Sequence, residues 1–397
     1  MTPNFEFGTP ANPEQAQQLG AILSQCFNSP LSEWSVYLNR IGTENFRVLR
    51  QGEQVAGGLA VLEMGQWFGG CRVPMAGLAA VGIPPEYRGM GAAVELLTRT
   101  LKEIQAKQLP ISVLYPATQY LYRQVGYEQG GTAAGLEVRL DALRLSVNQT
   151  SLKQIRALPM HAVTPNCDEF RSHYRQWAVK NNGNLDRNEA IWQSIIQPRE
   201  KETIYAYLVG SQTQPQGYII FKQDAKESEI VILDWVALNA AAAQRLWMFL
   251  ADHRSQIQKV FWRGAAINPF LLLLAEQTAK VRYLDRWMLR IIDVVKALKI
   301  RGYPAAVDTE LHLAIVDELL PENNGNFVLM VSGGRGEVTR GGKGELQLNI
   351  RGLAPLYTGL YTPSQLQVSG YLAGTDNAVL AATQIFAGAE PWMADFF

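Results

Sequence analysis

Apolar positions in the first 150 residues fall first at helical and then at strand spacing. Over residues 12–27, Leu19, Leu23 and Phe27 recur with the period of a helix that buries one face. The expected elements are helices at 12–27 and 31–41, strands at 46–51, 54–64 and 71–83, a helix from about Gly91, and a short strand at 111–115. The pattern therefore predicts two helices, a meander of strands, and a strand that leads into a further helix.

A similar order of elements returns after residue 150. The pattern predicts helices at 171–178 and 188–196, strands at 203–209, 217–222 and 229–238, and a helix at 240–254. The most apolar stretch, residues 268–275, is predicted to be a buried helix, since it is far shorter than the roughly 20 residues needed to cross a bilayer. No membrane-spanning helix is expected.

From residue 289 onward, strands precede helices. The expected elements are an amphipathic helix at 291–299, strands at 309–317, 326–333, 336–340 and 345–350, helical or irregular pieces at 351–357 and 362–369, and a helix at 373–386. The glycine-rich residues 333–344 lack Gly-Lys-Ser/Thr, which favours a hairpin with flexible turns over a phosphate loop. This order predicts a small α+β layer.

One stretch, residues 78–97, joins a strand to a helix through a glycine-containing loop. The apolar run 78–83 ends at two prolines, and the segment after Gly91 is rich in Ala, Leu, Val and Glu. Because the first N–H groups of a helix have no partner inside it, such a junction can bind an anion, and Arg88 adds a positive charge. An ordinary turn between strand and helix is the alternative interpretation.

The spacing of this loop resembles the R/Q-x-x-G-x-G/A signature of the GCN5-related N-acetyltransferases. In that family the loop and helix hold the pyrophosphate of acetyl-coenzyme A, and the preceding strand runs beside its pantetheine arm. The resemblance implies acetyl-coenzyme A as the co-substrate, held by Val81, Gly82, Ile83, Arg88, Gly89, Met90, Gly91, Ala92 and Ala93. The loop matches neither the dinucleotide G-x-G-x-x-G nor a P-loop, which disfavours nicotinamide cofactors and nucleoside triphosphates.

A second segment, residues 117–127, resembles the short helix that follows the next strand in this family. It reads ATQYLYRQVGY, with Val125-Gly126-Tyr127 at its end. The family places on this helix a Tyr that protonates the leaving thiol, which implies that Tyr122 is the general acid. The alternative for Tyr122 is an aromatic side chain that fills the core between helix and sheet.

The chain as a whole is similar to the enhanced intracellular survival family of N-acetyltransferases. The resemblance implies an α/β (α+β) fold with two tandem acetyltransferase domains, 1–150 and 151–288, and a sterol-carrier-protein-like domain, 289–397. The second domain has neither Arg nor Gly where the first has its phosphate loop, so we expect it to lack a cofactor site and to form a wall of the acceptor cleft. The resemblance also allows a lipid pocket in the third domain and implies a homo-oligomer, a hexamer.

The end of the chain, Ala394-Asp395-Phe396-Phe397, resembles the aromatic tail of this family, whose terminal carboxylate enters the active site. The resemblance implies that the Phe397 carboxylate accepts the proton of the amine. Members with broad aminoglycoside activity carry acidic residues where this chain has Ser29 and Phe396. A less negative cleft predicts weaker or narrower activity on aminoglycosides.

Composition and charge narrow the class of protein. Of the 397 residues 47% are hydrophobic, and 36 basic residues balance 36 acidic ones, so neither nucleic acid nor an anionic membrane surface is expected as a partner. Cys26, Cys71 and Cys167 are too few for a disulfide framework, and the histidines lack ligand spacing, so no metal is expected. The first ten residues lack the features of a secretory signal, and a cytoplasmic protein is predicted.

The leading hypothesis is an N-acetyltransferase that acts on a primary amine of a small molecule, such as an aminoglycoside or a polyamine. The amine would attack directly in a ternary complex, because neither Cys26 nor Cys71 has a His nearby in the sequence to activate it. Two alternatives stay open. The chain would either acetylate a lysine on a partner protein or bind coenzyme A and lipid without catalysis.

Overall fold

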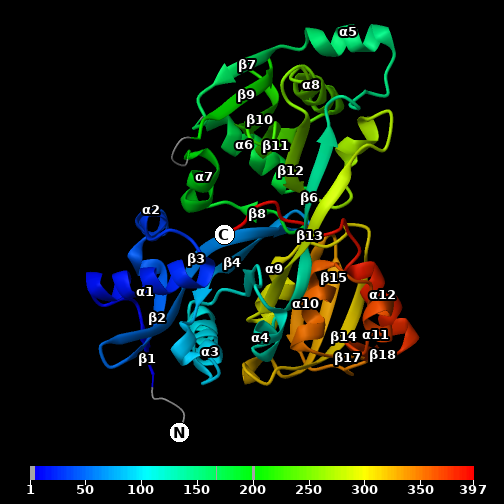
Figure 1. Ribbon diagram of the computed structural model, residues 1–397. Helices are drawn as coiled ribbons and strands as arrows, with labels where there is room; N and C mark the ends of the chain where they lie inside the picture. Colours follow the sequence, from blue (N-terminus) through cyan, green and yellow to red (C-terminus); the bar gives the residue numbers. More distant parts are fainter. Residues whose placement is uncertain (1–4, 167, 199–201) are drawn as a thin grey trace.

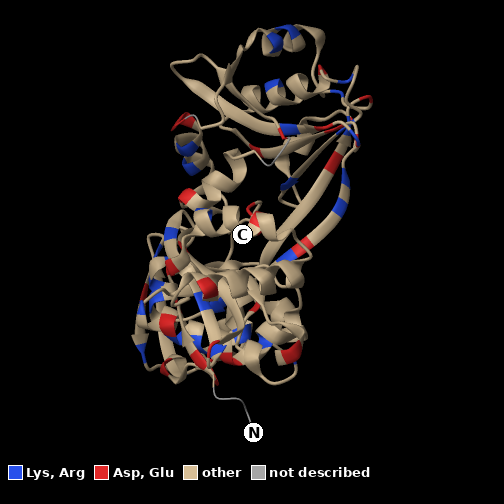
Figure 2. Ribbon diagram, turned by 60° about the vertical axis from the view of Figure 1, so that its left-hand side comes forward, with Lys and Arg blue, Asp and Glu red and all other residues tan. Residues whose placement is uncertain are grey.

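The chain forms three lobes that meet at two long strands, β6 (Glu128–Arg139) and β13 (Lys280–Ile291) (Figure 1). The computed structural model describes residues 5–166, 168–198 and 202–397, so Cys167 lies outside the described residues. Within these residues no helix is long and apolar enough to span a membrane. Figure 2 shows basic and acidic residues interspersed along the ribbon.

The first lobe has the predicted order of helices and meander. Its elements are β1 (Glu6–Gly8), α1 (Pro13–Phe27), α2 (Leu31–Ile41), β2 (Phe46–Gln51), β3 (Gln54–Phe68), β4 (Cys71–Gly82), α3 (Ala92–Ala106), β5 (Ile111–Leu114) and α4 (Gln119–Gln124). Asn12 begins α1 by accepting a hydrogen bond from the backbone N–H of Gln15, and Leu19 and Leu23 are buried on one face of that helix. The helices and strands predicted up to residue 115 are confirmed.

The second lobe repeats this order. Its elements are α5 (Gln149–Ala157), β7 (Met160–Val163), α6 (Asp168–Ala178), β8 (Leu185–Asp186), α7 (Glu189–Ile196), β9 (Ile204–Gly210), β10 (Pro215–Asp224), β11 (Glu229–Ala237), α8 (Ala240–Ala251) and β12 (Lys259–Gly264). The predicted helices and strands between residues 171 and 254 are confirmed. The pattern did not single out β6, β7, β8, β12 and β13.

The buried helix predicted at residues 268–275 is wrong. Asn268 caps a short 3-10 helix, η3 (Pro269–Leu273), which has no buried residue, and the side chain of Leu272 is 83% exposed. A 3-10 helix of this length completes less than two turns, so its leucines cannot all share one buried face.

One continuous sheet runs through the first and second lobes. Its strand order is β1-β2-β3-β4-β5-β13-β6-β12-β11-β10-β9-β7, with β8 paired to β3. β13 is antiparallel to both β5 and β6, so a strand from late in the chain lies between two strands of the first lobe. Residue 291, predicted to begin a helix, is instead the last residue of β13, and the helix starts two residues after Ile292 because the side chain of Asp293 caps it.

The third lobe packs helices against a separate five-stranded sheet with the order β16-β15-β14-β17-β18. Its elements are α9 (Val294–Ile300), β14 (Thr309–Val316), β15 (Gly325–Ser332), β16 (Arg335–Arg340), β17 (Leu346–Asn349), α10 (Ile350–Thr358), α11 (Pro363–Val368), β18 (Leu372–Gly374) and α12 (Asp376–Ile385). The predicted hairpin is confirmed, since β15 and β16 pair up to Ser332 and Arg335. The last helix begins at Asp376, later than predicted, because Ala373 pairs with Gln347 in the sheet.

After α12 the chain leaves the third lobe and returns to the junction of the first two (Figure 1). This tail is held by backbone hydrogen bonds. The N–H of Thr132 donates to the carbonyl of Pro391 (3.1 Å), and the N–H of Met393 donates to the carbonyl of Thr132 (3.0 Å). The side chain of Asn184 adds a hydrogen bond to the carbonyl of Trp392 (2.9 Å). The end of the chain therefore lies beside strands of the first lobe.

Candidate active site

In the first lobe, β4 and β5 part after Leu78 and Leu114. The two strands pair in parallel only from Met75 to Leu78 and from Ile111 to Leu114, and β4 then continues alone to Gly82. The pairing of β4 with β3 is irregular at this point, and Ala80 adopts a left-handed φ of 50°. Such a bulge disrupts the ladder and turns backbone groups away from it. The edge of β4 beyond Leu78 is therefore left without β5 as a neighbour.

The predicted phosphate loop follows directly and is exposed from Arg88 to Gly91. Gly89 and Gly91 have φ values of 76° and 82°, which glycine adopts at little cost, and the space where their side chains would lie is open. Helix α3 begins after Gly91 with no side-chain cap, so its first N–H groups point toward this open space. These features fit an anion at the start of the helix.

The other predicted contact residues line the same junction. Val81 is half-buried, Gly82 and Ile83 are buried, and Met90 is 43% exposed. At the start of α3, Ala92 is buried and Ala93 is half-buried. Arg88 turns back to the end of the strand, where its Nε donates to the carbonyl of Ile83 (3.0 Å). The guanidinium thus lies beside the end of β4.

Tyr122 lies in α4, close to the end of β5. Its side chain is 5% exposed and belongs to the same apolar cluster as Leu78, Ile83 and Ala92. Its ring packs edge to face against Tyr127, with 6.0 Å between ring centroids. Burial raises the pKa of the Tyr122 phenol to about 12. The phenol therefore stays protonated near neutral pH, as a proton donor must.

The tail brings Phe397 to the opposite side of β4. A Cβ atom placed on Gly77 would lie 2.7 Å from the Phe397 ring, so only glycine allows this close approach. Tyr115, which follows β5, donates a hydrogen bond to the carbonyl of Met393 (2.8 Å), and its ring lies 6.3 Å from that of Phe397. Thus Phe397 lies beside the last paired residues of β4 and β5.

A buried ion-pair network anchors the tail. Arg187 Nε donates to both carboxylate oxygens of Asp395 (2.9 and 3.1 Å), and the two terminal nitrogens of Arg187 bind Asp234 (2.6 and 3.1 Å). The Arg187 guanidinium also covers the ring of Tyr174 at 3.5 Å, and Tyr174 donates a hydrogen bond to Asp395 (3.2 Å). Despite Arg187, burial raises the pKa of Asp395. The second lobe thus fixes the tail two residues before its end.

Sequence reasoning missed this network. Arg187 and Asp395 are 208 positions apart, and Arg187 stands in no recognisable motif. One signal was available in the turn Asn181-Asn182-Gly183-Asn184, because amide-rich turns can bind a passing backbone. Asn182 and Asn184 do bind the tail, through the carbonyls of Ala389 and Trp392.

The equivalent helix of the second lobe is built differently. At the start of α8, the Asn239 side chain accepts a hydrogen bond from the N–H of Ala242 (2.9 Å). The N-terminus of α8 is thus capped by the protein itself, whereas that of α3 is open. Among the described residues, no cluster of three or more His, Cys, Asp or Glu side chains is arranged to hold a metal.

Comparisons with known proteins agree with this organisation. Residues 9–130 and residues 183–291 each match a family model described as an acetyltransferase (GNAT) domain, and residues 294–394 match a sterol carrier protein domain. The chain is similar to a crystal structure of a GCN5-related N-acetyltransferase from Anabaena variabilis, at 52% identity and a TM-score of 0.95 over 99% of this chain and 100% of that one.

Two further relatives are more distant. The N-acetyltransferase Eis of Mycobacterium tuberculosis is 24% identical over 324 residues, which cover 78% of this chain and 76% of Eis. The crystal structure of Eis1 from Mycobacterium abscessus shares the fold at 19% identity, with a TM-score of 0.82 over 99% of this chain and 100% of that one.

The chain belongs to the GCN5-related N-acetyltransferases, a family of acyltransferases that use acetyl-coenzyme A. Within that family it is an Eis-like protein, with two acetyltransferase domains and a C-terminal sterol-carrier-protein-like domain. The predicted α/β fold of this class is thereby confirmed.

Proposed function

We propose that the first domain transfers the acetyl group of acetyl-coenzyme A to a primary amine of a small molecule. The observation that supports this most directly is the parting of β4 from β5 beyond Leu78, with the uncapped start of α3 and the buried side chain of Tyr122 in the same apolar cluster as Leu78. In this proposal the thioester supplies an activated acetyl group, and the residues of the chain position it and move protons.

The open start of α3 would bind the pyrophosphate through backbone N–H groups from Gly89 to Ala93, with the Arg88 guanidinium beside it. The backbone of Val81, Gly82 and Ile83 would hydrogen-bond the pantetheine arm, because this edge of β4 lacks β5 as a partner. The fit rests on the open space at Gly89 and Gly91, which a side chain would occupy.

Two groups would move the protons. The Phe397 carboxylate would accept the proton of the attacking amine, directly or through water, as the C–N bond forms. The Tyr122 hydroxyl would donate its proton to the departing sulfur as the C–S bond breaks. The position of Phe397 beside Gly77 and the burial of Tyr122 support these roles.

The acceptor would be a small amine. The negative potential of the cleft that attracts this amine would be modest. Asp395 is buried and shares Arg187 with Asp234, and Phe396, which is 63% exposed, contributes no charge. We therefore expect weak or narrow activity on aminoglycosides.

The proposal also includes the division of the chain into three domains after residues 150 and 288. It further includes the hexamer that the family resemblance implies. Ile267 and Leu272 are 80% and 83% exposed, and large exposed apolar side chains of this kind are often covered by a partner copy. Light scattering on the purified chain tests this assembly, and a monomer would contradict it.

The test of the proposed activity is thiol release from acetyl-coenzyme A with spermidine, kanamycin and a lysine-containing peptide as acceptors. We expect turnover with spermidine and little with the peptide. A strong preference for the peptide would favour acetylation of a partner protein. No turnover with any of the three amines would overturn the proposed acceptor class.

A further inference from the structure

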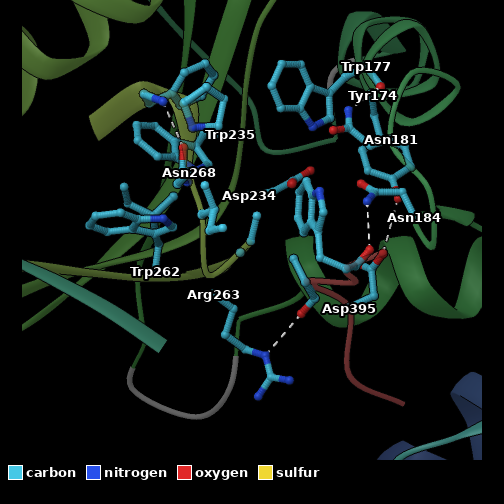
Figure 3. A pocket seen from close by; sticks show the side chains of 18 of the residues that line it. Tyr174, Trp177, Asn181, Asn184, Asp234, Trp235, Trp262, Arg263, Asn268 and Asp395 are labelled. Atoms are coloured by element: carbon cyan, nitrogen blue, oxygen red, sulfur yellow. Dashed lines mark hydrogen bonds between the residues drawn. The ribbon is translucent and has the colours of Figure 1, made fainter. Parts of the chain in front are cut away.

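The tail is not packed on every side. A cavity of about 370 Å³ lies in the second lobe, and Trp392, Ala394 and Asp395 of the tail form part of its lining (Figure 3). Side chains that border a cavity have few packing contacts on that side. The position of the tail therefore depends on the specific contacts that its last residues make elsewhere.

One side chain of the second lobe contacts the tail just before its end. Arg263 of β12 donates a hydrogen bond from Nε to the carbonyl of Ala394 (3.2 Å) (Figure 3). Its guanidinium also lies over the ring of Phe396, 5.5 Å from the ring centroid. Arg263 thus holds both the backbone and an aromatic side chain of the last four residues.

The same guanidinium contacts the first lobe. It lies over the ring of Tyr115, 5.3 Å from the centroid. That ring packs against Phe396 and Phe397, at 5.0 and 6.3 Å between centroids, and the Tyr115 hydroxyl donates to the carbonyl of Met393. Arg263 and Tyr115 therefore hold the end of the tail between them, one from the second lobe and one from the first.

Arg263 is itself held by β13. Its Nη1 donates to a carboxylate oxygen of Asp285 (3.0 Å), and its guanidinium lies 5.8 Å from the ring centroid of Tyr283. Arg263 and Tyr283 both pair with Gly135 of β6, where a Cβ atom would lie 2.4 Å from the Tyr283 ring. An arginine suits this position because its planar fork can donate to separate acceptors and lie against aromatic rings at the same time.

We propose that Arg263 is a positioning residue for acetyl transfer, which holds the tail from the second lobe so that the Phe397 carboxylate stays beside β4 and β5. This inference rests on the proposed function, because Arg263 acts through the carboxylate that is assigned there as the base. The second lobe, whose helix α8 is capped by Asn239, thereby takes part in the reaction of the first lobe.

Digestion with carboxypeptidase A, which removes aromatic residues from an accessible C-terminus, tests the position of the tail without any acetyl transfer. We expect Arg263→Ala to release phenylalanine from the folded chain about tenfold faster than wild type, as for the loss of one hydrogen bond from a charged donor. The matched control is Arg282→Ala, because Arg282 of β13 also has carboxylate partners and a ring beneath it, and these partners, Glu137, Glu229 and Phe261, lie outside the tail. Equal release from Arg263→Ala and wild type would overturn the proposal.

Steady-state kinetics test the consequence for the reaction. Arg263→Ala should lower kcat about tenfold or more, because a small misplacement of a catalytic group is costly. The KM for acetyl-coenzyme A should stay near that of wild type, since the proposed cofactor residues 81–93 lie at β4 and α3 of the first lobe. Arg282→Ala should match wild type in both constants. An unchanged kcat in Arg263→Ala would overturn the proposal, and so would a rise in this KM as large as the fall in kcat.

Arg263→Lys is a second variant, which keeps the positive charge and a hydrogen-bond donor but not the planar fork. Across wild type, Arg263→Lys and Arg263→Ala, the release of phenylalanine should rise step by step as kcat falls. Faster release without a fall in kcat would contradict the positioning role. A wild type that acetylates none of the three amines would instead overturn the proposed function, whereas phenylalanine release would still show whether Arg263 holds the tail.

Discussion

At the scale of single residues, Tyr122 shows how the environment of a side chain sets its chemistry. The same helix carries Tyr120, which is 76% exposed, while Tyr122 is 5% exposed. Burial raises the pKa of the Tyr122 phenol. A family motif could assign Tyr122 a role, but its burial became visible only in the folded chain.

Tyr122→Phe should lower kcat by about 10²–10⁴-fold, because the leaving sulfur loses its proton donor while the ring still packs. Thiol release from acetyl-coenzyme A measures this. Tyr120→Phe is the matched control and should retain wild-type kcat. If Tyr122→Phe kept full kcat, the assigned role would be wrong.

The raised pKa also predicts how Tyr122 titrates. An ordinary Tyr has a pKa of 10.0, whereas that of Tyr122 is about 12, so its phenol is still protonated at pH 10. The tyrosinate absorbance of wild type minus that of Tyr122→Phe should therefore be near zero at pH 10 and grow only toward pH 12. A difference titration with its midpoint near pH 10 would contradict the burial of this group.

At the scale of elements, β4 and the tail are fitted to each other through Gly77. A methyl group at this position would lie 2.7 Å from the Phe397 ring and 2.8 Å from Met64 Cε. Gly77→Ala should displace the tail and lower kcat by roughly tenfold, since a small misplacement of a catalytic group is costly. Steady-state kinetics measure the effect, with Gly8→Ala as control. Equal kcat in Gly77→Ala and Gly8→Ala would contradict a role of Phe397 in catalysis.

The Arg187 network is a second feature at this scale. Arg187→Ala would leave Asp234 and Asp395 buried without their cation, and breaking such a pair costs about 3–5 kcal/mol. Urea denaturation should show this loss of stability. Arg139→Ala, which removes an exposed ion pair with Asp141, is the control and should leave the denaturation midpoint near that of wild type. If both variants had a similarly small effect, the buried carboxylates of Asp234 and Asp395 would be neutralised or hydrated in another way.

At the scale of the whole molecule, the third lobe is joined to the long sheet by a buried ion pair. Arg290 of β13 is fully buried and binds both carboxylate oxygens of Asp317, which follows β14 (2.7 and 2.8 Å). Asp317→Ala would leave this guanidinium without its anion and should lower the free energy of unfolding by about 3–5 kcal/mol. Thermal and urea denaturation measure the loss. A stability equal to that of wild type would show that this pair does not hold the lobes together.

The sequence predicted what depends on local spacing and left open what depends on long-range pairing. Leu19 and Leu23 identify α1 because a helical face repeats within a few residues. Nothing local shows that Met288 pairs with Leu114 or that Arg187 binds Asp395, because these contacts join distant segments. The glycines of the loop were recognised by their spacing, whereas the role of Gly77 depends on an aromatic ring from the end of the chain.

The late position of β13 has a consequence for synthesis of the protein. When the first lobe leaves the ribosome, β5 and β6 lack the strand that separates them, since β13 is made much later. At about 5–20 residues per second, the delay is on the order of ten seconds. During that time two strand edges are exposed, and unpaired edges promote aggregation. The facing edges of β5 and β6 therefore gain their partner in the finished sheet only when β13 emerges.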